Sequence, residues 1–145
     1  MQNRARATER ILATQMGTDG IQYTNIGDAL LRAGEEFETQ RAREEAKKVI
    51  VLLTDGEALE PNRPLRDGDP EFAKTFAKDI AQKLKDSGVT LYTIGLGVNA
   101  NEGFLTAIAS TKAQYFASPT VADLRDVYKQ IASTLCKKPP TAIEI

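Results

Sequence analysis

Two short segments carry oxygen side chains at positions where a metal ion could bind. Residues 24–30 read TNIGDAL, and residues 52–57 read LLTDGE. Thr24 begins one expected helix, and Asp55 follows one expected strand. A hydroxyl and a carboxylate are hard oxygen ligands of the kind that Mg²⁺ prefers. Both residues also have plainer interpretations, because threonine is a common helix N-cap and Asp-Gly is a common turn.

Composition excludes most other site chemistry. The chain has 145 residues, no histidine and one cysteine, Cys136. Imidazole catalysis, histidine-ligated zinc and an internal disulfide are therefore ruled out. Glu57 and Glu60 lie close to Asp55 in the sequence, but no basic partner is defined for them, so we do not expect an enzyme. The net charge of −1 gives no reason to expect a nucleic acid or a membrane as partner.

The ends of the chain carry no recognisable targeting signal. The first residues, MQNRARATERILATQM, are too charged for a secretory signal, and no apolar stretch reaches membrane-spanning length. We therefore expect a cytoplasmic location if the chain is a complete gene product, and the location is unknown if it is a fragment. We expect one domain over residues 1–136 and a disordered tail over 137–145.

Apolar residues mark an alternation of helices and strands. Helical periodicity is expected over 3–16, from Thr24 to Phe37, from Pro70 to Leu84, over 101–110, and from Thr120 to Leu135. Uninterrupted apolar runs predict strands at 49–53, 89–97 and 114–118. This alternation predicts an α/β fold, a Rossmann-like three-layer αβα arrangement around a parallel sheet. Functional groups in such sheets gather at the carboxyl ends of the strands, where Thr24 and Asp55 can converge.

Several segments occur in the order seen in von Willebrand factor A domains. They read TNIGDALLRAGEEF, KKVIVLLTDGEA, VTLYTIGLG and QYFASPTVADLRDVYKQI, and the resemblance covers roughly residues 21–135. It implies a Rossmann-like sheet with a metal-ion-dependent adhesion site, which binds Mg²⁺ or a similar ion and recognises protein ligands. The resemblance gives Thr24 and Asp55 the role of metal ligands. It also implies that the binding loops are shaped by Asn25, Gly27, Gly56 and Glu57.

The sequence departs from the family pattern in one respect that matters for metal binding. The family's D-x-S-x-S loop, which follows its first strand, is absent, as are the strands that precede the threonine loop. The chain thus resembles the C-terminal portion of an incomplete domain. Mg²⁺ demands octahedral oxygen coordination, so we expect Mg²⁺, Mn²⁺ or Ca²⁺ to bind weakly or not at all. The expected function is a non-catalytic protein-interaction module with a partial metal site; the alternative is a scaffold that has lost metal binding.

The absent strands also predict an exposed sheet edge. In the complete family fold, residues 49–53 would lie beside the first strand. Here they form an apolar edge with no expected neighbour, and such edges promote association. We therefore expect the chain to form a homodimer through residues 49–53, or to pair there with a strand of another polypeptide.

Overall fold

The structure is a computed structural model that describes residues 24–56, 70–98, 100–118 and 120–136. Three expectations lie outside these residues: the helix at 3–16, the loop that begins at Glu57, and the tail at 137–145.

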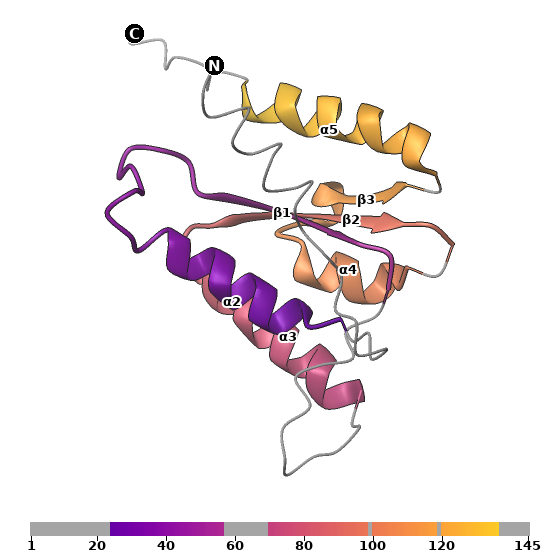
Figure 1. Cartoon of the computed structure of the whole chain (residues 1–145), viewed down its shortest axis with the longest axis horizontal. Coiled ribbons are helices and arrows are strands. Elements are labelled where there is room, and N and C mark those ends of the chain that lie inside the picture. The colour runs from indigo at the N-terminus through magenta and orange to yellow at the C-terminus, as the bar shows by residue number, and fades with distance from the viewer. Residues whose placement is uncertain (1–23, 57–69, 99, 119, 137–145) are drawn as a thin grey trace, which may run out of the picture.

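The described strands form one parallel sheet. β1 (Val49–Thr54), β2 (Thr90–Leu96) and β3 (Tyr115–Ser118) lie side by side in the order β1-β2-β3. Val49 pairs with Thr90, and Thr93 pairs with Tyr115. All three strands therefore end at the same edge, on the right of Figure 1.

Helices cover both faces of this sheet. Figure 1 shows helices both below and above the sheet. The lower helices are α2 (Ile26–Glu36), α3 (Pro70–Asp86) and α4 (Glu102–Ile108), and the upper one is α5 (Val121–Leu135). The predicted α/β class and the parallel sheet between helices are confirmed.

The core has one cluster on each face. Below the sheet, Ile26, Leu30 and Leu91 are buried together with residues of α3 and α4. Above it, Tyr92 and Ile94 pack against Val127 and Ile131 of α5. β2 is thus buried on both faces, as continuous apolar strands between helices usually are. The same expectation for β1 is wrong, because its residues before Thr54 are only half-buried or exposed.

The contact between α2 and α3 depends on small residues. On α3, Phe76 and Leu84 pack partly buried against the core. In the structure Ile80 is buried, but the other fully buried positions are alanines: Ala73, Ala77 and Ala81. Gly27 accounts for the burial of these alanines, because it lets α2 approach α3 closely. A Cβ at Gly27 would lie 2.6 Å from Cε1 of Phe76 and 3.4 Å from Cα of Ala77. The helices approach at a point where neither can carry a larger side chain.

Two helices begin with side-chain caps. Thr120 caps α5 and forms a reciprocal capping box with Asp123. For α2 the cap is Asn25, whose Oδ1 accepts a hydrogen bond from the Asp28 backbone N–H at 2.9 Å. The interpretation of Thr24 as the helix cap is therefore wrong.

We expect Gly27→Ala to lower the free energy of unfolding by about 1–3 kcal/mol, because the added methyl group overpacks the contact with Phe76. Gly103→Ala in α4 is the matched control. The nearest atom to its Cβ would be Oδ1 of Asn101 at 3.7 Å, so helix propensity should leave stability unchanged or raise it by up to about 1 kcal/mol. Urea unfolding of both variants measures the difference, and equal stabilities would contradict the close packing.

The cap assignment makes a second prediction. Asn25→Ala should lower the free energy of unfolding by about 1 kcal/mol, because it removes the acceptor for the Asp28 N–H. Thr24→Ala should change it by less than about 0.5 kcal/mol. Thermal and urea unfolding can compare the two, and a larger loss in Thr24→Ala would return the capping role to that residue.

Candidate metal site at the carboxyl ends of the strands

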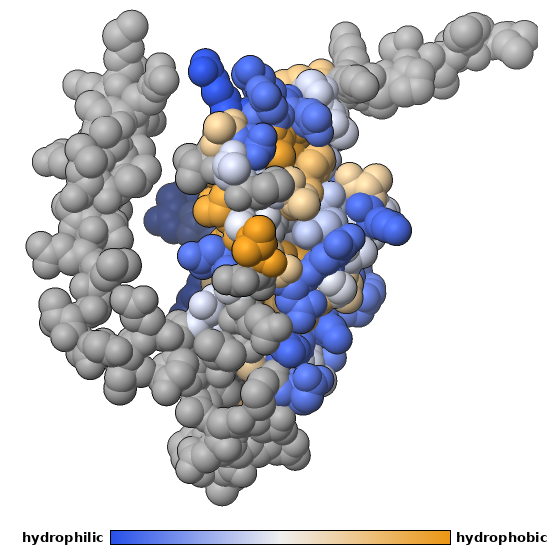
Figure 2. Space-filling view, turned by 90° about the vertical axis from the view of Figure 1, so that its right-hand side faces the viewer, coloured by the Kyte–Doolittle hydropathy of each residue, from blue (hydrophilic) through white to orange (hydrophobic). Residues whose placement is uncertain are grey.

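The candidate site lies at the edge where the parallel strands end. Figure 2 faces this edge and shows a small hydrophobic patch within a largely hydrophilic surface. Because Thr54 pairs with Gly95, the turn that contains Asp55 lies beside the end of β2. The described residues at this edge therefore come from the start of α2 and from the turns that follow β1 and β2.

A threonine fixes the turn that presents Asp55. The Thr54 side chain is buried, and its hydroxyl donates to the Gly56 carbonyl at 3.2 Å and accepts from the Gly56 N–H at 3.3 Å. These contacts bend the chain immediately after β1. Asp55, between the two bonded residues, is exposed, so its carboxylate is open to solvent.

The structure brings the two predicted loops together. A Cβ at Gly56 would lie 3.7 Å from Oγ1 of Thr24, so the threonine hydroxyl lies against the turn that presents Asp55. Since Asn25 caps α2, the Thr24 hydroxyl is not used at the helix start. Within the described ranges it has no hydrogen-bond partner. The hydroxyl and the carboxylate thus belong to neighbouring segments of one surface.

These donors fit a divalent cation in kind but not in number. A hydroxyl and a carboxylate match the oxygen preference of Mg²⁺ and Mn²⁺. Among the residues that the structure describes, no group of three or more histidine, cysteine, aspartate or glutamate side chains could hold a metal. Thr24 and Asp55 would fill only part of an octahedral shell.

The residues predicted to shape the loops have distinct positions. Gly56 lies in the Asp55 turn, and Asn25 holds the start of α2 next to Thr24. Gly27 lies inside α2 and packs against α3, so it affects the loop only by setting where the helix lies. Glu57 is outside the described residues.

Sequence reasoning missed one residue at this edge. Val98 follows β2 and is 92% exposed, the largest exposure among the large hydrophobic side chains described. Gly97 precedes it with a φ of +79°, a conformation that glycine adopts without strain. A glycine followed by valine just beyond a strand end could have indicated this exposed side chain, because a glycine turn there carries the next side chain away from the core.

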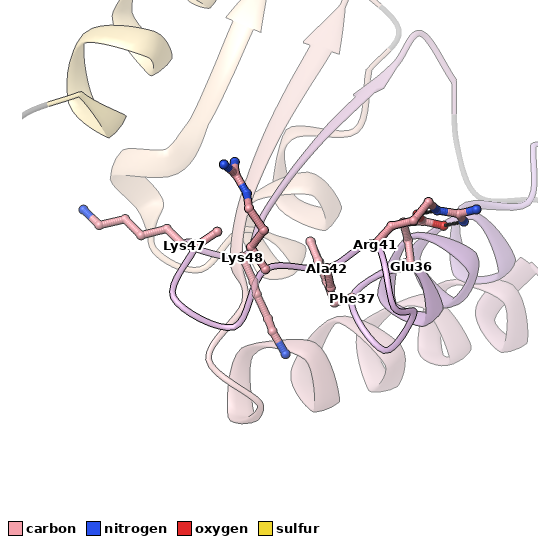
Figure 3. Close-up of a pocket in the computed structure, with 8 residues that line it drawn as sticks. Glu36, Phe37, Arg41, Ala42, Lys47 and Lys48 are labelled. Atoms are coloured by element: carbon pink, nitrogen blue, oxygen red, sulfur yellow. Dashed lines mark hydrogen bonds and ion pairs between the residues drawn. The ribbon is translucent and has the colours of Figure 1, made fainter.

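A hollow of about 210 Å³ lies at the opposite end of the molecule, between the end of α2 and the start of β1 (Figure 3). Two of its charged residues, Glu36 and Arg41, pair with each other. Arg41 donates to both carboxylate oxygens of Glu36 at 2.8 and 2.7 Å, and this hydrogen bonding lowers the pKa of Glu36. Lys48 lies 6.0 Å from the ring centre of Phe37. These contacts hold the charged segment 41–48 as a folded connector beyond the end of α2 at Glu36.

No helix in the described part of the chain is both long and apolar enough to cross a membrane.

Among curated proteins, the chain is 28% identical over 135 residues to the collagen alpha-6(VI) chain of Mus musculus, an alignment that covers 88% of this chain. It is 26% identical over 123 residues to von Willebrand factor A domain-containing protein 2 of Xenopus laevis, across 83% of this chain. The aligned regions span only 5% and 14% of those relatives. A collagen chain among them gives no support to the cytoplasmic location expected from the sequence.

Solved structures share the fold. Proximal thread matrix protein 1 from the mussel byssus, solved with a zinc-occupied metal-ion-dependent adhesion site, superposes with a TM-score of 0.66 at 26% identity, over 92% of this chain and 29% of that one. Manganese-loaded TRAP protein of Plasmodium vivax superposes with a TM-score of 0.56 at 24% identity, over 94% of this chain and 46% of that one. Residues 2–130 match the von Willebrand factor type A domain, and the chain therefore belongs to this family of protein-interaction modules, some of which bind a metal ion.

Proposed function

We propose that the chain is a non-catalytic protein-interaction module whose binding surface is the edge where β1 and β2 end. The observation that carries this proposal is the approach of the Thr24 hydroxyl to the Asp55 turn. Two segments far apart in the sequence thereby offer hard oxygen donors to the same space. The exposed Val98 adds an apolar contact on the same edge, next to a site that attracts charge.

The roles of the donors follow from their chemistry. Asp55 would contribute the charged ligand and Thr24 a neutral one, directly or through a water molecule. A bound Mg²⁺ or Mn²⁺ would supply positive charge and open coordination positions for an acidic side chain of a protein partner. The zinc-occupied site of the mussel protein supports a cation at this edge, since the two chains are 26% identical and share the fold.

The absence of catalysis is part of the proposal. Histidine is absent from the whole sequence, and Asp55 is exposed with no neighbouring acid among the described residues of its turn. An exposed carboxylate without a base or a nucleophile beside it can hold a cation or a partner, but has no group with which to share proton transfer.

The small number of donors favours a second function, that of a scaffold without useful metal affinity. One hydroxyl and one carboxylate leave most of an octahedral coordination shell to water. In that case Thr24 and Asp55 would take part in protein contacts only through hydrogen bonds. Metal titration separates the two functions directly.

We expect Mn²⁺ to bind the chain with a dissociation constant on the order of millimolar, as is found for weak oxygen sites. Asp55→Ala should weaken binding at least about tenfold, because it removes the charged member of the two described donors, and Thr24→Ala should weaken it less. Isothermal titration calorimetry with Mn²⁺ and Mg²⁺ is the measurement. Asp126→Ala is the matched control, since this exposed aspartate pairs with Lys129 on α5, away from the site.

The titration has two outcomes that contradict the metal site. Absence of saturable binding would favour the scaffold function. Binding that survives unchanged in Asp55→Ala would place the cation elsewhere on the chain.

A further inference from the structure

The hollow between the end of α2 and the start of β1 combines an apolar surface with a cationic rim. Most of its surface is apolar, and its uncharged lining residues are Phe37, Ala42 and Ala46. The other lining residues are charged: Glu36, Arg41, Arg43, Lys47 and Lys48. Cations therefore outnumber carboxylates in the lining by three. Because the whole chain has a net charge of −1, this excess of positive charge is local.

Two of these cations are not neutralised by a carboxylate of the described residues. Arg41 and Lys48 each lie close to one, at 2.7 and 3.8 Å. Arg43 and Lys47 are exposed, and in the described parts of the chain neither makes a hydrogen bond or an ion pair. The acidic pair at 44–45 lines the adjoining surface and not the hollow. The charges of Arg43 and Lys47 are thus available to a ligand.

The cations flank the apolar part of the hollow instead of converging on one point. Figure 3 shows Lys47 and Arg41 extending to opposite sides, with Phe37 and Ala42 between them. Lys48 points away from Lys47. A small anion such as phosphate is held by polar groups that converge, so this arrangement does not suit one. It suits a longer ligand that carries an apolar group between negative charges.

The size and the rigidity of the hollow favour a protein segment as this ligand. Its volume is about 210 Å³. Sites for cofactors and other small molecules usually enclose roughly 300–1,000 Å³, so the hollow is better matched to a single side chain. The connector that forms it is held by its own backbone: the Ala42 N–H donates to the Thr39 carbonyl at 3.0 Å, and the Ala46 N–H to the Arg43 carbonyl at 3.1 Å.

We propose that this hollow binds an acidic segment of a protein partner. An apolar side chain of the partner contacts Phe37 and Ala42, and carboxylates on either side of it lie beside Arg43 and Lys47. Protein interfaces commonly combine a side chain anchored in a pocket with complementary charges at the rim. The hollow and the Asp55 edge lie at opposite ends of the molecule, so the module is able to hold two partners at once. This proposal goes beyond the proposed function and requires no metal.

The first test uses two peptides with blocked ends, Glu-Glu-Phe-Glu-Glu and Glu-Glu-Gly-Glu-Glu. Each is titrated into the whole 145-residue chain in EDTA, and the amide NMR signals of the protein are followed. We expect the phenylalanine peptide to bind with a dissociation constant on the order of 0.1–1 mM. The glycine peptide should bind at least about fivefold more weakly, because it lacks the apolar anchor. No saturable binding of the phenylalanine peptide, or equal affinities of the two, would overturn the proposal.

Charge reversal tests which cations hold the peptide. Arg43→Glu and Lys47→Glu should each raise the dissociation constant of the phenylalanine peptide at least about fivefold, because a carboxylate then faces a carboxylate. Lys78→Glu is the matched control, since this exposed lysine of α3 does not line the hollow, and it should change the constant less than about twofold. A loss in Lys78→Glu as large as in the other two would mean attraction by net charge alone, and would contradict a site at the hollow.

The NMR signals also locate the contact. Saturation with the phenylalanine peptide should shift the amide signals of Phe37, Ala42 and Ala46, and should leave those of Gly56 and Val98 unchanged. Shifts confined to the last two would place the peptide at the Asp55 edge and overturn the proposal. Dextran sulfate tests a sulfated polysaccharide as the occupant. Tighter binding of dextran sulfate than of the peptide, without a shift at Phe37, would assign the cations to a polyanion and would also overturn it.

Discussion

The parallel pairing of β1 with β2 is the constraint on which the other features of this molecule depend. It brings the ends of both strands to one edge, and it aligns Thr54 with Gly95. The Asp55 turn therefore opens beside the turn that exposes Val98. The same pairing fixes which backbone groups of β1 are used by β2. The site, and the side of β1 that no other described strand pairs with, are thus two results of a single ladder.

Much of the fold could be predicted from the sequence, because its signals are local. Uninterrupted runs of β-branched and aliphatic residues marked β1 and β2, and Thr120 followed by Asp123 marked the start of α5. The cap of α2 could not be assigned in the same way. Thr24 and Asn25 are adjacent, both can cap, and only the backbone path decides which of them accepts the Asp28 N–H. The burial of the alanines of α3 could not be predicted either, because it depends on the closeness of α2 at Gly27.

The candidate site shows the same division between local and tertiary information. The types of the two donors could be recognised from TNIGDAL and LLTDGE, and so could their place at the strand ends. Their approach depends on how α2 packs, which no short segment encodes. Val98 was not predicted, because the exposure of one apolar side chain depends on the direction of the turn at Gly97. The donors available to a cation could be judged in kind from the sequence, and the structure adds that Thr24 lies against the turn that presents Asp55.

The packing of α2 on α3 has a consequence for motion. Asp55 is attached to the sheet through β1, whereas Thr24 is carried by a helix whose most extensive contacts are with another helix. Packed helices slide past one another at lower cost than a hydrogen-bonded strand can leave its ladder. The distance between the two oxygens is therefore set by the softer of the two attachments. A ligand that holds both oxygens at once would restrain α2 against the sheet, and would lose part of its binding free energy in ordering that helix.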